Sequence, residues 1–332
     1  MAILVTGAAG FIGFHVASAL LARGERVLGL DCLNEYYDIR LKQARLRQLA
    51  MEPGFLFQRT DISDRQTVFD FIDQHCDIDG IIHLAAQAGV RYSLIDPYAY
   101  VQSNVMGHLV MQEAARRTPR LKHFVYASSS SVYGLNRKMP FIESDSVDTP
   151  ISLYAATKRA DELMSHVYGH LFQLPQTGLR FFTVYGPWGR PDMAYFSFAR
   201  AIQRGEPINV YGDGLLKRDF TYIDDIVAGV IGCLDCPPGG EMPNRVLNIG
   251  NNRAELVNTL IQLLEKSLGK NAIINNMPRP ALDVEATFAS IDAIHVLTGY
   301  VPATPLSSGI PRFVAWFLEW EGRPDASEAS SL

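Results

Sequence analysis

The stretch Ala2-Ile3-Leu4-Val5-Thr6-Gly7-Ala8-Ala9-Gly10-Phe11-Ile12-Gly13 decides the fold, because it joins a short apolar run to three spaced glycines. The run at residues 2–6 predicts a buried strand, and the apolar stretch at residues 14–22 predicts a helix. Glycines between a strand and a helix permit a tight turn, close approach of a pyrophosphate and close packing of the helix on the strand. The spacing G-x-x-G-x-x-G differs from the generic G-x-G-x-x-G, but strand, turn and helix together predict a dinucleotide-binding turn.

An acidic residue at the end of the second predicted strand supports this interpretation. Residues 26–30 form that strand, and Asp31 follows it, about 20 residues after the glycines. A carboxylate at this position is placed to bind the adenosine ribose hydroxyls, and it would repel a ribose phosphate. The sequence therefore favours NAD over NADP.

Strands and helices continue to alternate along the first half of the chain. Strands are predicted at residues 55–59, 80–84, 123–127 and 176–182, and helices at residues 65–75, 98–117 and 153–170. This alternation is typical of a doubly wound α/β fold, a parallel Rossmann sheet with helices on both faces. Ligands of such sheets bind beyond the carboxyl ends of the strands. We therefore expect one shared site at the strand ends that carry the glycine turn, Asp31, Asp61, Ala85, Ser129 and the loop after Phe182.

The character of the sequence changes after Phe182. A turn-rich segment at 186–191 precedes a predicted helix at 195–204 and a turn at Tyr211-Gly212-Asp213-Gly214. We expect an NAD-binding domain of residues 1–182 and 219–250, and a smaller α/β substrate-binding lobe of residues 183–218 and 251–321. The polar residues 322–332 predict a flexible tail.

A tyrosine and a lysine four residues apart are candidates for catalysis. The run Ser128-Ser129-Ser130-Ser131 is followed further along the chain by Tyr154-Ala155-Ala156-Thr157-Lys158. On a helix this spacing places the tyrosine and lysine side chains on one face. The ammonium group favours the phenolate, so Tyr154 can act as a general base toward an alcohol while a serine hydroxyl bonds the same oxygen. The alternative is an ordinary exposed helix that happens to carry such a pair.

The composition argues against several classes of function. A net charge of −5 gives no electrostatic footprint for nucleic acid or an anionic membrane, and no apolar run reaches membrane-spanning length. Cys233-x-x-Cys236 stands without a second pair, so the four cysteines predict free thiols in a reducing compartment, the cytoplasm. His166 and His170 have no nearby third ligand in the sequence, and we expect no metal site.

The glycine turn, the serine run and the Tyr154/Lys158 pair stand in the order typical of the extended short-chain dehydrogenase/reductases, which the chain resembles from Ile3 to about Trp320. Within that family the chain is similar to the UDP-glucuronate 4-epimerases. Three stretches carry this closer resemblance: Leu33-Asn34-Glu35-Tyr36-Tyr37-Asp38, Ala85-Ala86-Gln87-Ala88-Gly89-Val90-Arg91-Tyr92-Ser93, and Arg180-Phe181-Phe182-Thr183-Val184-Tyr185-Gly186-Pro187-Trp188-Gly189-Arg190-Pro191-Asp192-Met193-Ala194. The resemblance implies an NAD-dependent isomerase that interconverts UDP-glucuronate and UDP-galacturonate through a transient 4-keto sugar.

The resemblance also implies a role for each site residue. Tyr154 would be the base, Lys158 would bond the nicotinamide ribose, and Ser129 would bond the reacting hydroxyl. NAD would also be bound by Gly7, Gly10, Phe11, Ile12, Gly13, Asp31, Asp61, Ile62, Leu84, Ala85 and Ala86. The UDP-sugar would be bound by Arg91, Ser129, Ser130 and Ser131, by Thr183 and Arg190 at the sugar carboxylate, by Arg218 and Arg279 at the diphosphate, and by Asp283 at the uridine ribose.

Rival functions on the same scaffold differ at the serine run. The resembling 4,6-dehydratases carry Asp-Glu before Val-Tyr-Gly and the decarboxylases carry Glu, whereas this chain has Ser130 and Ser131. Another nucleotide-sugar 4-epimerase and a UDP-glucuronate decarboxylase remain alternatives. So does a dinucleotide-sensing module without catalysis, although such modules usually lose the tyrosine and lysine.

The chain departs from the resembling pattern at three places. Cys32 replaces the asparagine usual after the ribose-binding acid, and Ser290 replaces a common aspartate. The segment 278–284 has Arg279 one position further from Asp283 than the pattern, which leaves the diphosphate contacts open.

The helices at 98–117 and 153–170 form the usual dimer face of the resembling family, so a homodimer is implied. The alternative is that these helices merely cover the sheet.

Overall fold

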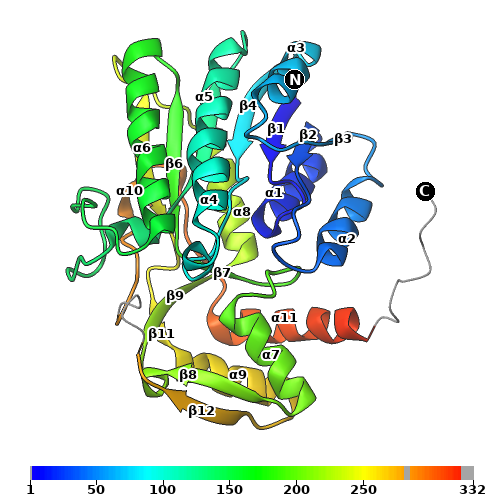
Figure 1. The fold of residues 1–332 in the computed structure, drawn as a ribbon, viewed down its shortest axis with the longest axis vertical. Helices are drawn as coiled ribbons and strands as arrows, with labels where there is room; N and C mark the ends of the chain where they lie inside the picture. The colour runs from blue at the N-terminus through cyan, green and yellow to red at the C-terminus, as the bar shows by residue number, and fades with distance from the viewer. Residues whose placement is uncertain (1, 280–284, 323–332) are drawn as a thin grey trace.

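A parallel sheet of seven strands forms the upper part of the molecule in Figure 1. The computed structural model describes residues 2–279 and 285–322. The strand order is β10-β6-β5-β4-β1-β2-β3, and all neighbouring strands are parallel. The strands are β1 (Ala2–Thr6), β2 (Arg26–Asp31), β3 (Phe55–Arg59), β4 (Ile78–His83), β5 (His123–Ser129), β6 (Gln176–Phe181) and β10 (Asn244–Ile249). The predicted doubly wound sheet is confirmed.

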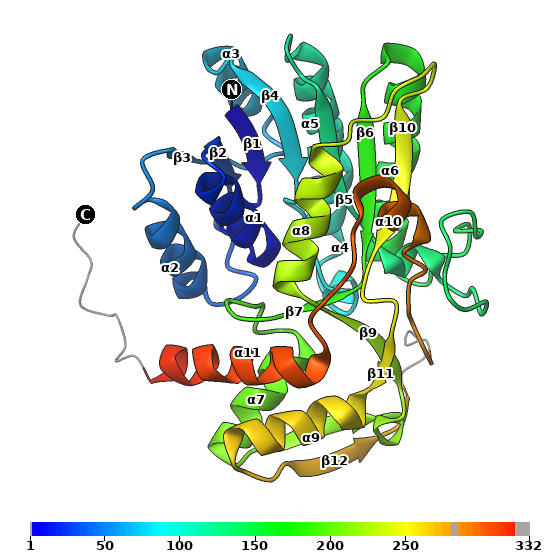
Figure 2. The ribbon, with the colours of Figure 1, turned by 180° about the vertical axis from the view of Figure 1, so that it is seen from behind.

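Helices cover both faces of this sheet (Figures 1 and 2). On one face α1 (Phe11–Ala22) packs against α2 (Ile39–Leu49) and α8 (Ile223–Leu234). On the other face α5 (Gly107–Arg117) packs against α3 (Arg65–Gln74) and α6 (Leu153–Phe172). Helix α1 begins at Phe11, inside the glycine motif and earlier than the predicted start at residue 14, because Gly10 already serves as its N-cap.

The helix predicted over residues 98–117 is present, but its geometry is not uniform. It consists of α4 (Pro97–Tyr100), a π-helical segment (Val101–Met106) and α5. Asp96 caps the start by accepting a hydrogen bond from the Ala99 N–H. The wider segment places Asn104 in the interior, where its side chain can bond neighbouring elements.

The lower lobe consists of two small sheets and the helices beside them (Figure 1). Strands β7 (Thr183–Tyr185) and β11 (Ala254–Leu256) flank β9 (Lys217–Tyr222), while β8 (Pro207–Tyr211) pairs with β12 (Ile273–Met277). Helices α7 (Ala194–Arg204), α9 (Val257–Leu268) and α11 (Leu306–Glu321) pack on this lobe, and α10 (Asp292–Thr298) packs on α8 and β10. The predicted division into two domains by residue range stays a prediction.

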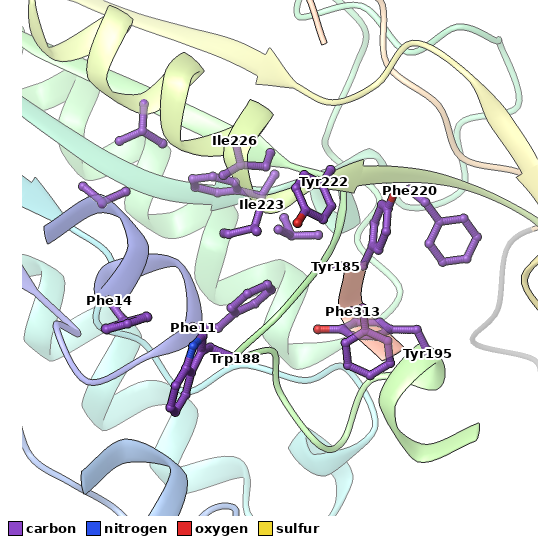
Figure 3. Close-up of a cluster of buried hydrophobic side chains, with 14 of the residues drawn as sticks. Phe11, Phe14, Tyr185, Trp188, Tyr195, Phe220, Tyr222, Ile223, Ile226 and Phe313 are labelled. Carbon is purple, nitrogen blue, oxygen red and sulfur yellow. The ribbon is translucent and has the colours of Figure 1, made fainter. Parts of the chain in front are cut away.

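A buried apolar cluster connects the two parts (Figure 3). Aromatic rings of the segment after β7 pack between α1, α8 and α11, so the lobe is fixed to the sheet by burial of apolar area. The figure labels Phe11, Phe14, Tyr185, Trp188, Tyr195, Phe220, Tyr222, Ile223, Ile226 and Phe313.

Candidate functional site

The glycine turn lies at the point where the strand order reverses. Strand β1 lies between β2 and β4, so the turns after β1 and β4 meet at the carboxyl edge of the sheet. Gly7 has a φ of +71°, and a Cβ there would lie 2.8 Å from the Ala85 nitrogen. A Cβ on Gly13 would lie 2.0 Å from the Gly7 carbonyl oxygen, so only glycine allows this packing. Within the described chain no side chain caps α1, so its first N–H groups are available to an anion such as a pyrophosphate.

Asp31 holds this turn from the neighbouring strand. Its Oδ2 accepts a hydrogen bond from the Ala9 N–H at 3.2 Å, and its Oδ1 accepts one from the Leu33 N–H at 2.8 Å. An ionised carboxylate has lone pairs for about four such bonds, so a ribose hydroxyl can be accepted as well. The position of Asp31 at the end of β2 therefore suits the predicted contact.

The other predicted cofactor residues differ in how they face this turn. The Leu84 and Ala85 N–H groups donate to the backbone and side-chain oxygens of Thr6, both at 3.2 Å, which fixes residues 84–86 beside the glycines. Asp61 follows β3 and accepts two hydrogen bonds from Ser63, at 2.9 and 2.8 Å. Phe11 and Ile62 are buried in the two halves of the core, so at Phe11 the backbone rather than the ring can reach a ligand, whereas Ile12 is half-buried.

The serine run ends strand β5 and begins a short 3₁₀ turn. Strand β5 extends to Ser129, two residues further than predicted. The Ser129 hydroxyl oxygen accepts hydrogen bonds from the Ser131 N–H at 3.2 Å and the Ser131 hydroxyl at 2.9 Å. A hydroxyl has two acceptor lone pairs and one donor, so Ser129 retains its proton for donation to another oxygen. This is the bonding expected of a group that donates to an alcohol or ketone oxygen.

Helix α6 carries Tyr154 and Lys158, and Tyr154 lines the same cleft as Ser129. Ser152 caps the helix by accepting the Ala155 N–H at 3.1 Å, which starts it directly before Tyr154. The Lys158 ammonium is buried and donates to the Ala127 carbonyl at 3.0 Å and to Asp161 Oδ2 at 3.1 Å. An ammonium has three donors, so among the described residues one N–H of Lys158 stays available to a ligand.

The sequence did not single out the partner of Lys158. Asp161 is buried, and burial raises its pKa to about 7 although Lys158 opposes this shift. Burial lowers the pKa of His83 to about 3 and that of His108 well below its usual value, and Lys158 lowers both further. The two histidines are therefore neutral near pH 7, and Lys158 supplies the positive charge that favours a phenolate. The i, i+3 spacing of Lys158 and Asp161 is visible in the sequence, but the burial is not.

A second polar side chain that the sequence did not reveal connects the β4 loop to helix α6. Asn104 donates to the Gln87 carbonyl at 3.1 Å and to the Thr157 hydroxyl at 3.0 Å, and it accepts the Gln87 N–H at 2.8 Å. These bonds fix the loop after β4 relative to the helix of Tyr154. Periodicity predicts the helix but cannot predict the π-helical segment that turns Asn104 inward.

A cleft of about 1220 Å³ lies between the sheet and the lower lobe. Its lining includes most of the predicted catalytic and substrate residues: Arg91, Ser129, Ser130, Ser131, Tyr154, Thr183, Arg190 and Arg218. The structure thus brings together residues from five separate stretches of the chain. Arg279 is exposed and lies outside this lining, and its Nη1 is 3.9 Å from Glu285 Oε2. Asp283, the other predicted contact, lies outside the described residues.

Arg190 reaches the cleft as part of an ion pair. Its Nη2 lies 2.5 Å from Asp192 Oδ2, and its Nε lies 3.1 Å from Asp192 Oδ1. The Tyr36 hydroxyl donates to the same carboxylate at 3.1 Å, and all three residues line the cleft. An incoming carboxylate would therefore meet a guanidinium that already has a partner. Tyr36 and Asp192 lie in two of the quoted stretches, but only the structure joins them to Arg190.

Residues 2–279 and 285–322 contain no group of three or more His, Cys, Asp or Glu side chains that could hold a metal ion. Among the helices in these ranges, none combines the length and the apolar character that crossing a membrane requires.

Comparisons with known proteins agree with this geometry. Residues 3–250 match the NAD dependent epimerase/dehydratase family. The chain is 45% identical over 332 residues to a probable UDP-glucuronate 4-epimerase of Rhizobium meliloti, covering 96% of this chain and 97% of the relative. It is 47% identical over 335 residues to UDP-glucuronate 4-epimerase 1 of Arabidopsis thaliana, covering 97% and 78%. The crystal structure of UDP-glucuronic acid 4-epimerase from Bacillus cereus with UDP-glucuronic acid and NAD has a TM-score of 0.89 at 35% identity, covering 96% and 100%.

Proposed function

The chain belongs to the NAD dependent epimerase/dehydratase family, and from this premise we propose that it is a UDP-glucuronate 4-epimerase. The observation that carries the proposal is that Tyr154, Ser129 and Arg190 line one cleft, and that Ser129 ends a strand of the parallel sheet whose carboxyl edge carries the glycine turn. Names of relatives at 45% and 47% identity over nearly the whole chain support the substrate. The product is proposed to be UDP-galacturonate, which reactions of polysaccharide biosynthesis can consume.

The described residues fit a bound NAD. Gly7, Gly10 and Gly13 would admit the diphosphate at the start of α1, where no side chain bonds the first N–H groups, and Asp31 would accept the adenosine ribose hydroxyls. Residues 61–62 and 84–86 would border the adenine and the centre of the cofactor. When bound, NAD supplies the hydride acceptor and donor for carbon 4 of the sugar.

Three side chains would handle the proton of the sugar's 4-hydroxyl. Tyr154 is proposed to take it as a phenolate, which the buried Lys158 ammonium favours. Ser129 would donate its remaining hydroxyl proton to the same sugar oxygen and stabilise charge there. For inversion, the flat 4-keto sugar must turn over in the cleft, whose volume of about 1220 Å³ leaves space for such a movement.

Recognition of the rest of the substrate is proposed from the lining of the same cleft. Arg91, Ser130 and Ser131 would contact the sugar, Thr183 and Arg190 its carboxylate, and Arg218 the diphosphate. Arg279 and Asp283 stay proposed contacts of the diphosphate and uridine ribose.

The four cysteines are free, which fits the proposed location in the reducing cytoplasm.

Incubation of the purified protein with UDP-glucuronate, followed by NMR of the products, tests the function. We expect UDP-galacturonate to form until the two sugars reach equilibrium. A pentose product would instead identify a decarboxylase, and conversion of other UDP-sugars alone would identify another 4-epimerase. Binding of NAD without any conversion would favour the sensing module.

Replacement of Arg190 by alanine should change both affinity and product. A 4-keto uronate is a β-keto acid, so the enzyme must hold its carboxylate out of line with the ketone to prevent loss of carbon dioxide. A guanidinium can hold a carboxylate with two parallel hydrogen bonds. We expect Arg190→Ala to weaken UDP-glucuronate binding by about 1.5–3 kcal/mol and to raise the share of pentose product. Calorimetric titration and product NMR measure the two effects.

Asp192→Asn is the matched variant for Arg190→Ala. It removes the charge that pairs with Arg190 at 2.5 Å, so the guanidinium becomes freer to bind the sugar carboxylate and affinity should rise. If Arg190 only braces its loop, both variants will lower the melting temperature while affinity and product ratio stay unchanged. That result would remove Arg190 from the substrate site.

The homodimer is proposed from an exposed apolar surface on α6 and the helix at 97–117. Leu163, Val167 and Leu171 repeat every four residues along α6 and are 52%, 46% and 62% exposed. Tyr98 and Met106 on the neighbouring helix are 84% and 45% exposed. Because α5 packs beside α6, a second copy placed on these helices would bury the surface in a four-helix arrangement.

Introducing a charge on this surface should separate the subunits. We expect Val167→Glu to be monomeric in light scattering coupled to gel filtration, because a buried unpaired carboxylate opposes association. Val296→Glu is the control, since Val296 is 86% exposed on α10, away from the two helices. A Val167→Glu variant with the same mass in solution as wild type would contradict the proposed interface.

A further inference from the structure

Arg45 on helix α2 is a buried arginine that the proposed mechanism does not use. Its side chain is 0% exposed, and its guanidinium donates five hydrogen bonds, as many as an arginine has N–H groups. The acceptors are the carbonyl oxygens of Ala9 at 2.8 Å, Trp188 at 3.1 and 2.6 Å and Gly189 at 3.1 Å, and the Tyr37 hydroxyl at 2.8 Å. Every donor of this side chain is therefore satisfied.

All of these acceptors are neutral. A guanidinium keeps its charge at every pH that a protein tolerates, and burying a charge without a counter-charge is costly. Among the described residues no carboxylate bonds to Arg45. Burial lowers the pKa of neighbouring His15 to about 4, so that imidazole is neutral, while Lys42 adds a second cation near Tyr37.

The hydrogen bonds of Arg45 join two parts of the molecule, the glycine turn and the residues before Arg190. Through the Ala9 carbonyl its charge lies directly behind the glycine turn, where the diphosphate of a dinucleotide would bind. Through Trp188 and Gly189 it holds the residues that precede Arg190 in the chain. The His15 ring bonds the Pro187 carbonyl at 3.0 Å, and Trp188 packs on Phe14 with ring centres 5.6 Å apart (Figure 3). The loop at 187–190 is thus attached to α1 and α2, not only to the lower lobe.

We propose that Arg45 is a positioning residue that supplies a buried counter-charge for the dinucleotide diphosphate and couples cofactor binding to the loop at 187–190. The proposal rests on the proposed function in one respect, that a dinucleotide binds at the glycine turn. Because the same guanidinium bonds the turn and the loop, a bound diphosphate stabilises Arg45 in the place from which it holds Trp188 and Gly189. The cleft side chain of Arg190 is then fixed before the sugar arrives.

Three variants test the two functions of the side chain. Arg45→Met removes the charge at similar length, and Arg45→Lys keeps the charge but has too few donors for all the acceptors. Arg47→Met is the control, because Arg47 is exposed on the same helix. The measurements are the dissociation constants of NAD and adenosine, the NAD content after purification, and amide hydrogen exchange of residues 186–193 with and without NAD.

We expect Arg45→Met to bind NAD roughly tenfold more weakly or worse, since one charge interaction is lost, and to bind uncharged adenosine as wild type does. NAD should slow exchange of residues 186–193 in wild type and Arg47→Met but not in Arg45→Met. Arg45→Lys should keep most of the NAD affinity, while the amides of residues 186–193 exchange faster than in wild type. If Arg45→Met does not fold, Arg45→Lys alone tests the proposal.

Two results distinguish failure of this inference from failure of the proposed function. A wild-type protein that does not bind NAD overturns both. A wild type that binds NAD, with a folded Arg45→Met or Arg45→Lys showing the same NAD affinity and the same loop protection, overturns the role of Arg45 alone. Equal weakening of NAD and adenosine also overturns it, because a merely structural residue would act on both.

Discussion

Replacement of Tyr154 by phenylalanine should lower turnover of UDP-glucuronate by a factor on the order of 10² or more, as expected for loss of a positioned general base. The hydroxyl is the only group that the variant removes, and the ring contact with Tyr100, with centres 6.0 Å apart, can persist. The buried contacts of Lys158 with Ala127 and Asp161 also remain. The fold and the NAD content should therefore stay close to wild type.

Product formation measured by NMR tests the loss of turnover. NAD content measured after denaturation tests whether the cofactor is still bound. Tyr98→Phe is the matched control, because Tyr98 lies outside the cleft lining and phenylalanine keeps the ring that Tyr98 contributes to the proposed dimer surface. Near-normal turnover of Tyr154→Phe would disprove the proposed base.

The parts of the fold that the sequence predicted depend on local patterns. The apolar run before Gly7 has the predicted bounds, and the second strand is one residue longer than predicted because it includes Asp31. Both were predictable because each is short, apolar and followed by turn residues. Strand β10 could not be placed in advance, since its pairing with β6 joins segments about seventy residues apart through parallel backbone bonds. The helix at 97–117 was predicted by its length and periodicity, but not its π-helical segment.

The candidate site also has features that the sequence predicted and features that only the structure shows. Tyr154 and Lys158 are one helical turn apart, so spacing alone indicated that they face together. The bonds of Arg45 to Trp188 and of Tyr36 to Asp192 join residues 143 and 156 positions apart, which no local pattern encodes. Burial is likewise invisible in the sequence, and it is burial that raises the pKa of Asp161 to about 7 and distinguishes Lys158 from an ordinary surface lysine.

The buried pair of Glu162 and Arg180 gives the largest expected effect on stability. Glu162 lies two turns after Tyr154 on α6, and Arg180 lies on β6. Glu162 Oε1 accepts from Arg180 Nε at 2.8 Å and Oε2 accepts from Nη2 at 2.9 Å, with the two side chains 1% and 3% exposed. The Ser128 hydroxyl donates to the same carboxylate at 2.6 Å, so the pair fixes the serine strand to the catalytic helix.

Glu162→Gln should lower the free energy of unfolding by about 3–5 kcal/mol, because it leaves the Arg180 charge buried without its carboxylate. Chemical denaturation measures the loss. Glu113→Gln is the control, since Glu113 pairs with Arg116 on the surface of α5 and its loss should cost about 1 kcal/mol or less. The double variant Glu162→Leu/Arg180→Met should recover stability relative to Glu162→Gln, because no fully buried charge is left unpaired. Arg159, which also pairs with Glu162 at 3.1 Å, is 28% exposed and can be solvated.

Activity separates the structural role of this pair from a catalytic one. Glu162 is absent from the cleft lining, so the turnover of each folded Glu162→Gln molecule should stay within a few-fold of wild type, with the remaining loss arising from shifts of Ser128 and Ser129. A variant that keeps its stability would show that Arg180 finds another counter-charge. A stable Glu162→Gln variant that loses as much turnover as Tyr154→Phe would show that the carboxylate affects the reaction through the serine strand. Glu162 would then belong to the site and not only to the fold.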